Sequence, residues 1–188
     1  MDSKYGNMLF NIPYYSQHRD VRDPLWQKRA CGVACLKMLI ETSGVETPPL
    51  DEMILEGVAL GAYSEHGWTH EGLISLGATY GGAFARKEFK SKDADEEEAI
   101  RLNKEGIDMI LSELKEGRPI IVSAIKNFEL RDKFHLVLIV GVETEDGAIK
   151  GFYYHDPDHD TEEDGAYQFV SFEIFMDTWR RMAIFIKE

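Results

Sequence analysis

The segment FHLVLIVGVETEDGAIKGFYYHDP, residues 134–157, decides which fold this chain can adopt. Two apolar runs, residues 134–142 and 148–154, flank an Asp-Gly pair at positions 146 and 147. An Asp-Gly pair favours the tight turn of a β-hairpin, so the segment predicts two antiparallel strands. Further apolar runs at residues 119–125 and 182–186 are expected to add strands to this hairpin.

The region before these strands has a helical pattern. Residues 32–41 are apolar at most positions, which fits a buried helix that ends before Gly44. Residues 93–117 open with acids and end in Gly-Arg-Pro, which are the start and stop signals of one helix or of a broken helix pair. Shorter helices are expected at residues 50–57, 69–76 and 172–180, and a short strand at residues 167–172. Helices followed by antiparallel strands are typical of the α+β class.

The length and composition fit one packed domain, residues 1–188. The 188 residues are 44% apolar and 11% aromatic, and no Pro-, Gly- or Ser-rich linker divides them. Twenty-one basic residues against 34 acidic ones give a net charge of −13, which argues against nucleic acid or an anionic membrane as the main partner. No apolar stretch approaches the roughly 18 residues of a membrane span, and no secretory signal opens the chain, so we expect a cytoplasmic location.

Two cysteines lie where a polar segment meets the expected buried helix. Cys31 stands at the start of that helix, and Cys35 lies one turn deeper. Unpaired backbone N–H groups and the helix dipole at a helix start favour a thiolate, so Cys31 is a candidate nucleophile. The alternative is that both are small core residues, as buried cysteines usually are. Because they lie one helical turn apart, we expect two free thiols in a reducing compartment.

Two later residues favour a catalytic role for Cys31. His135 begins the most apolar strand, and Asp156 follows the partner strand of the same hairpin. Counting outward from the Asp-Gly turn places positions 135 and 156 near each other at the open end of the hairpin. A cysteine at a helix start that faces a histidine and an acid from adjacent strand ends is the arrangement of a cysteine hydrolase. The alternative is a buried histidine hydrogen-bonded to a structural aspartate.

Five short motifs, in order, resemble one family of enzymes. They are IPYYSQ at residues 12–17, CGVACLKM at 31–38, GRPII at 117–121, FHLVLIVG at 134–141 and HDP at 155–157. Together they are similar to the bacteriocin-processing peptidases that act on double-glycine leaders, and to their stand-alone relatives, a branch of the papain-like cysteine peptidases. The resemblance implies a papain-like fold, with the cysteine on a helical N-terminal part and the histidine and aspartate on a C-terminal antiparallel sheet.

The resemblance also implies roles for four residues. It makes Cys31 the nucleophile, His135 the general base and acid, Asp156 the residue that orients the imidazole, and Gln17 the side-chain donor of the oxyanion hole. Gln27, four residues before the cysteine, is the alternative donor. The implied activity is hydrolysis of a peptide bond through a thioester, with a peptide or protein substrate and no cofactor.

Several functional questions stay open at this level. The chain shows neither the membrane span nor the phosphate-binding Gly-rich loop of the transporter-linked members, so recognition of a double-glycine leader does not follow. A catalytically silent peptide-binding module and a papain-fold acyltransferase or amidase are the alternative functions. The net charge favours neutral or basic peptides, and the sequence does not indicate an oligomeric state.

Two histidine-containing stretches resemble metal sites. Residues 155–164 combine two histidines with several acids but lack the spacing of a calcium loop, so we expect a solvated acidic loop. His66 and His70 lie four residues apart without the glutamate of a zinc motif, and Gly67 disfavours a helix between them. We expect these two histidines to lie in the wall of a cleft.

Overall fold

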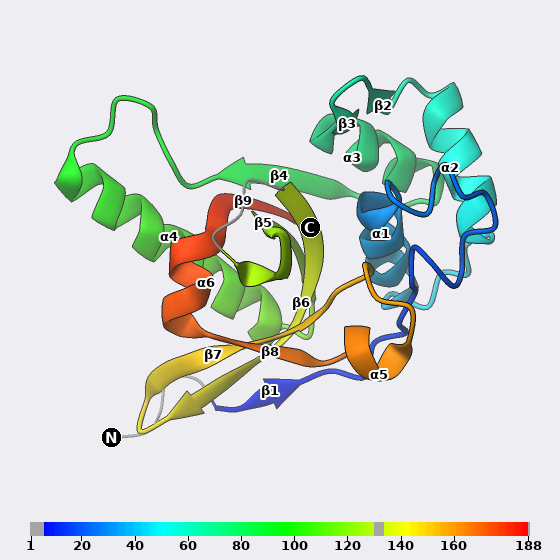
Figure 1. Ribbon diagram of the computed structural model, residues 1–188. Coiled ribbons are helices and arrows are strands. Elements are labelled where there is room, and N and C mark those ends of the chain that lie inside the picture. Colours follow the sequence, from blue (N-terminus) through cyan, green and yellow to red (C-terminus); the bar gives the residue numbers. More distant parts are fainter. Residues whose placement is uncertain (1–5, 130–133, 188) are drawn as a thin grey trace.

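The computed structural model describes residues 6–129 and 134–187, and an antiparallel sheet forms its centre (Figure 1). The strands lie in the order β4, β9, β5, β6, β7, β8, and the short β1 pairs with β6 beyond the end of β5. Their bounds are β1 Met8–Leu9, β4 Phe84–Glu88, β5 Ile120–Ile125, β6 Phe134–Glu145, β7 Ala148–His155, β8 Gln168–Ser171 and β9 Trp179–Ile186. A separate hairpin joins β2 (Tyr63–Ser64) to β3 (Gly67–Trp68).

Helices cover both faces of the sheet. Helices α1 (Cys31–Glu41), α2 (Leu50–Ala59) and α3 (His70–Thr79) gather on one side, and α4 (Glu96–Lys115) and α6 (Phe172–Thr178) lie on the other (Figure 1). Two short helices, η1 (Lys126–Phe128) and α5 (Glu162–Gly165), lie in connecting segments. Helix α1 packs against β6 and is buried from Gly32 to Ile40, which explains why its sequence is apolar at most positions. The predicted α+β class is confirmed.

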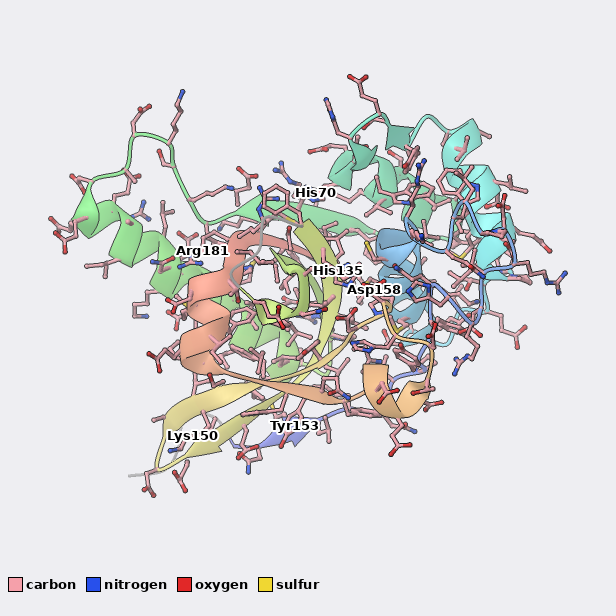
Figure 2. The ribbon with its side chains drawn as sticks, viewed as in Figure 1. His70, His135, Lys150, Tyr153, Asp158 and Arg181 are labelled. Carbon is pink, nitrogen blue, oxygen red and sulfur yellow. The ribbon has the colours of Figure 1, made fainter. Side chains whose placement is uncertain are left out.

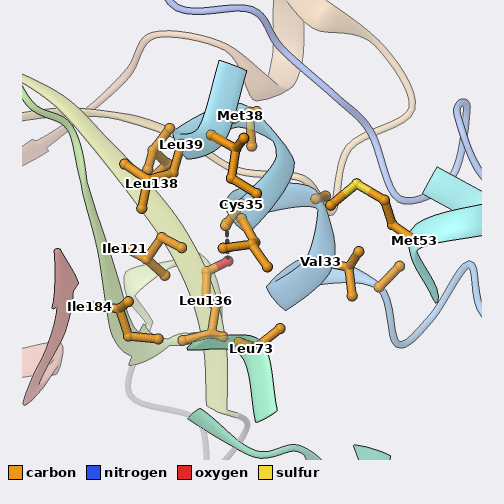
Figure 3. Close-up of a cluster of buried hydrophobic side chains, with 14 of the residues drawn as sticks. Val33, Cys35, Met38, Leu39, Met53, Leu73, Ile121, Leu136, Leu138 and Ile184 are labelled. Atoms are coloured by element: carbon orange, nitrogen blue, oxygen red, sulfur yellow. Dashed lines mark hydrogen bonds between the residues drawn. The ribbon is translucent and has the colours of Figure 1, made fainter. Parts of the chain in front are cut away.

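One sheet serves two hydrophobic cores because neighbouring side chains of a strand point to opposite faces. Ile121 of β5 packs with Leu136 and Leu138 of β6 in the core that includes α1 (Figure 3). Its neighbour Ile120 packs instead with Ile139 in the core that includes α4 and α6. The alternation fixes the sheet between the two helical layers and holds α1 against β6.

The β6–β7 hairpin has the predicted turn but a different register. Asp146 and Gly147 have φ values of 52° and 81°, as a tight Asp-Gly turn requires. Two irregularities in the pairing then place His155 opposite Leu138. The end of β7 therefore does not reach the level of His135, and Asp156 lies on the loop that follows the strand.

Helix α4 is one continuous helix rather than a broken pair. Its N-cap is Asp95, whose Oδ1 accepts a hydrogen bond from the backbone N–H of Glu98 at 2.8 Å. Gly106 lies inside the helix, where a Cβ would stand 2.4 Å from the ring of Trp179. This glycine allows close approach of the helix to the sheet and does not mark a break.

Candidate active site

Cys31 is the first residue of α1. Its N-cap, Ala30, provides no side-chain hydrogen bond to the exposed N–H groups of the first turn, which therefore remain available to a negative charge. The thiol is half-buried, whereas Cys35 lies fully inside the core and donates to the carbonyl of Leu136 at 3.3 Å (Figure 3). Both cysteines are free, as predicted.

His135 lies at the start of β6 and contacts both other predicted residues. Its Nε2 donates to Oδ1 of Asp156 at 2.6 Å, and both side chains are buried. The same carboxylate oxygen accepts the backbone N–H of Asp158 at 2.9 Å. The imidazole also interacts with the thiol of Cys31, which lines the same hollows of the surface. The structure thus brings Cys31, His135 and Asp156 together in that order.

The charges of Cys31, His135 and Asp156 shift one another's pKa values. Burial raises the pKa of Cys31, but the interactions with His135 and with the backbone of Leu136 outweigh it, so the pKa of the thiol lies below its ordinary value. Burial alone would lower the pKa of His135, yet Cys31 and Asp156 together raise it. Burial raises the pKa of Cys35 well above the ordinary value, so the pKa values of the two thiols are shifted in opposite directions.

The segment before Gln17 is tied to the loop that carries Asp156. The hydroxyl of Tyr14 donates to the carbonyl of Asp156 at 2.8 Å, and the hydroxyl of Ser16 donates to the carbonyl of His159 at 2.5 Å. The backbone N–H of Gln17 donates to the carbonyl of Pro157 at 2.8 Å. The IPYYSQ and HDP motifs therefore form one unit, although about 140 residues separate them in the sequence.

Gln17 is buried beside the thiol, and its carboxamide has a fixed orientation. Nε2 donates to Oδ1 of Asp158 at 2.5 Å, and a primary amide nitrogen carries a second N–H. Gln27, the alternative donor, instead donates to the carbonyls of His18 and Val21 at 3.1 and 2.9 Å. Gln17 lines the hollow beside Cys31, and Gln27 is not among its lining residues in the described part of the chain.

A cleft passes over Cys31 and His135. It consists of two hollows, of about 320 and 670 Å³, that share these two residues together with Lys28, His66 and Phe134. Volumes of this size are typical of ligand-binding clefts. The first hollow continues between Tyr63, Trp68, His70 and Arg180, and the second continues toward Gln17, His18, Lys126 and Asp158. His66 and His70 therefore lie in a cleft wall, as the sequence predicts.

The prediction of a solvated loop at residues 155–164 is wrong for its first half. His155 and Asp156 are 0% and 1% exposed, and the side chain of Asp158 is also buried. Asp158 accepts from Nε2 of His18 at 2.8 Å and pairs with Lys126, so partners distant in sequence compensate its charge. Figure 2 shows Asp158 next to His135 beside α1. Within residues 6–129 and 134–187, no three metal-ligating side chains converge on a common point.

Comparison with known proteins identifies the family. The model of the Peptidase_C39-like family matches residues 9–184. The chain belongs to this family. This membership, together with the fold, places the protein among the papain-like cysteine peptidases. Among curated protein sequences, none matches this chain. No helix in the described part of the chain has the length and apolar character to cross a membrane.

Three solved structures share the fold. A protein described as a C39-like peptidase from Bacillus anthracis is 16% identical, with a TM-score of 0.64 over 97% of this chain and 98% of that one. A double-glycine-motif protease from an AMS/PCAT transporter, solved with its leader peptide, is 18% identical, with a TM-score of 0.57 over 98% and 96%. The peptidase domain of Streptococcus ComA, a bifunctional ABC transporter of a quorum-sensing pathway, is 20% identical, with a TM-score of 0.55 over 89% and 95%.

Proposed function

We propose that this C39-like family member hydrolyses peptide bonds with Cys31 as nucleophile, His135 as general base and acid, and Asp156 as the residue that orients His135. One observation carries the proposal. The thiol at the start of α1 shares a cleft and an electrostatic interaction with an imidazole whose Nε2 donates to a buried carboxylate. That arrangement is the one that activates a thiol and holds its base in the useful tautomer. The family match over residues 9–184 supports treating the whole chain as one peptidase domain.

The first step is formation of an acyl-enzyme. The proton of the Cys31 thiol passes to His135, and the sulfur attacks the carbonyl carbon of the scissile bond. The negative charge that develops on the carbonyl oxygen is stabilised by the backbone N–H of Cys31 and the second N–H of Gln17. His135 then returns the proton to the leaving amine, and the C–N bond breaks to leave a thioester on Cys31.

The second step releases the acid product. His135 takes a proton from water, and the resulting hydroxide attacks the thioester carbonyl at the same oxyanion site. The C–S bond breaks, and Cys31 leaves as a thiolate beside the protonated imidazole. Asp156 stabilises that imidazolium in both steps without itself taking the proton. Cys31, His135 and the attacking water account for every proton transfer, so the mechanism calls for no cofactor.

A peptide library tests this function directly. We expect wild-type protein to generate new peptide termini that mass spectrometry detects, and we expect Cys31→Ala to generate none. Cys35→Ala is the matched control, because Cys35 lies in the core and should affect stability rather than cleavage. A wild-type protein that leaves every peptide intact, or a Cys31→Ala protein that still cleaves, would overturn the proposal.

A further inference from the structure

The cleft beside Cys31 has the opposite charge to the molecule as a whole. The chain carries a net charge of −13, yet the lining of the two hollows includes Lys28, Arg29, Lys126 and Arg180. Among the described lining residues the single acid is Asp158. A local excess of cations in a concave site attracts anions even when the net charge of the protein is negative.

The acid and the cations divide unevenly between the two hollows. Asp158 lies in the hollow that contains Gln17, where it pairs with Lys126 and accepts from His18. The other hollow holds Arg29 and Arg180 and, within the described residues, no acid at all. On the side of Arg29 and Arg180, the described lining residues therefore include cations but no acid.

The cations of this hollow have no carboxylate partner among the described residues. Lys28 is exposed and forms no ion pair with the described residues, and the guanidinium of Arg29 donates to the hydroxyl of Tyr63 at 3.3 Å. The guanidinium of Arg180 stacks on the ring of Phe134 at 3.2 Å from its centroid, and Phe134 is 61% exposed. Stacking fixes the guanidinium plane but leaves its N–H groups able to bind a carboxylate side by side.

We propose that the substrate is a peptide with an aspartate or glutamate near the scissile bond, bound by Lys28, Arg29 and Arg180. The proposal builds on the proposed function, because the same cleft presents the scissile bond to Cys31. The aromatic side chains Tyr63, Trp68 and Phe134 provide apolar surface for neighbouring residues of that peptide. This local lining reverses the preference for neutral or basic peptides that the net charge suggests.

Binding to the Cys31→Ala protein tests this preference without any turnover. Each fluorescently labelled peptide contains a central Ala-Gly bond, and the peptides are compared in pairs that differ only by Asp or Asn at one position. That position is varied over the three residues on either side of the Ala-Gly bond. At one position or more, the Asp peptide should bind roughly 3- to 10-fold more tightly, since each exposed pair contributes modestly. The difference should shrink at high salt, because screening weakens such contacts.

Charge variants identify the residues responsible. The double change Lys28→Gln with Arg29→Gln should remove most of the preference for Asp. The double change Lys90→Gln with Lys92→Gln is matched in charge, lies in the exposed segment between β4 and α4 away from the cleft, and should keep the preference (Figure 1). Equal binding of Asp and Asn peptides at every position, tighter binding of Lys peptides, or no binding at all would overturn the inference.

The result is separable from the proposed function. If wild-type protein cleaves nothing while Cys31→Ala still prefers acidic peptides, the peptidase assignment fails and the charge preference stands. If wild-type protein cleaves Asp and Asn peptides with equal kcat/KM and Cys31→Ala binds them equally, the peptidase assignment stands and the charge preference fails.

Discussion

Among single residues, Gln17 is buried in the cleft, and its side chain is hydrogen-bonded to Asp158. Asp158 accepts one of its two amide N–H bonds, and in the proposed mechanism the other donates to the developing oxyanion. Replacing Gln17 with Ala should lower kcat by roughly 10²-fold and change KM little, because this donor contributes mainly in the transition state. Steady-state kinetics on a cleaved peptide measure both constants.

Gln27→Ala is the matched control for that experiment. The amide of Gln27 holds the carbonyls of His18 and Val21, so its loss should leave kcat near the wild-type value. A larger loss of kcat in Gln27→Ala than in Gln17→Ala would show that the oxyanion donor is Gln27.

His155 makes the stability of the fold depend on pH. Its ring packs edge-on against Tyr14 and Tyr167, with centroids 5.6 and 4.6 Å away. Burial lowers the pKa of this histidine to about 4, and the nearby backbone of Pro13 offsets only part of that effect. The unfolded chain, with an ordinary pKa of about 6.5, binds a proton first as the pH falls. The stability that the buried, neutral His155 contributes is therefore present above about pH 6.5 and is lost as the pH falls toward 4.

The prediction concerns the slope of stability against pH. Between pH 7 and pH 5 the free energy of unfolding should fall by about 2 kcal/mol more in wild type than in His155→Phe, which keeps an aromatic ring but cannot titrate. Urea unfolding at the two pH values measures this difference. His66→Phe, at an exposed position, should retain the wild-type slope. Parallel slopes for wild type and His155→Phe would contradict the account.

The sequence predicts some of these site residues better than others. A single local turn relates His135 to Asp156, so their proximity could be anticipated even though the detailed register could not. Asp158 was missed because its partners Gln17, His18 and Lys126 come from two distant segments. A run of acids resembles a solvated surface unless those partners are known.

Among the elements, helix α4 depends on close contact with the sheet. A Cβ on Gly106 would lie 2.4 Å from Trp179 and 2.8 Å from Phe89. Gly106→Ala should therefore destabilise the protein by about 1–3 kcal/mol through overpacking, despite the better helix propensity of alanine. Ser112→Ala, at an exposed position of the same helix, measures propensity alone and should be neutral or slightly stabilising. Denaturant midpoints decide the sign, and a more stable Gly106→Ala would contradict this packing.

Elements with strong local signals were predicted, and elements set by tertiary contacts were not. The apolar runs and the Asp-Gly turn indicated β5, β6 and β7, and the capping and apolar patterns indicated α1 to α4. Strand β4 was missed because FARKE is largely charged and forms only by pairing with β9. Strand β9 begins at Trp179, earlier than predicted, because Arg180 and Arg181 interrupt the apolar pattern.

At the scale of the whole molecule, the proposed site exists only when three parts of the fold meet. Cys31 comes from α1, His135 from β6, and Asp156 from the loop after β7. The two hydrophobic cores on opposite faces of the sheet hold these parts in place. The lowered pKa of Cys31 and the raised pKa of His135 are therefore properties of the assembled fold rather than of either residue alone.

The pH dependence of Cys31 alkylation by iodoacetamide tests this central claim most directly. A thiolate paired with a protonated imidazole should react from well below pH 8.5, with rates still appreciable near pH 5, up to the raised pKa of His135. Removing that partner in His135→Ala should move the profile upward toward a free thiol near pH 8.5, and Asp156→Ala should move it less. Cys35 serves as the internal control and should stay unlabelled in the native protein. A wild-type profile that matches a free thiol, and that does not respond to His135→Ala, would contradict the account.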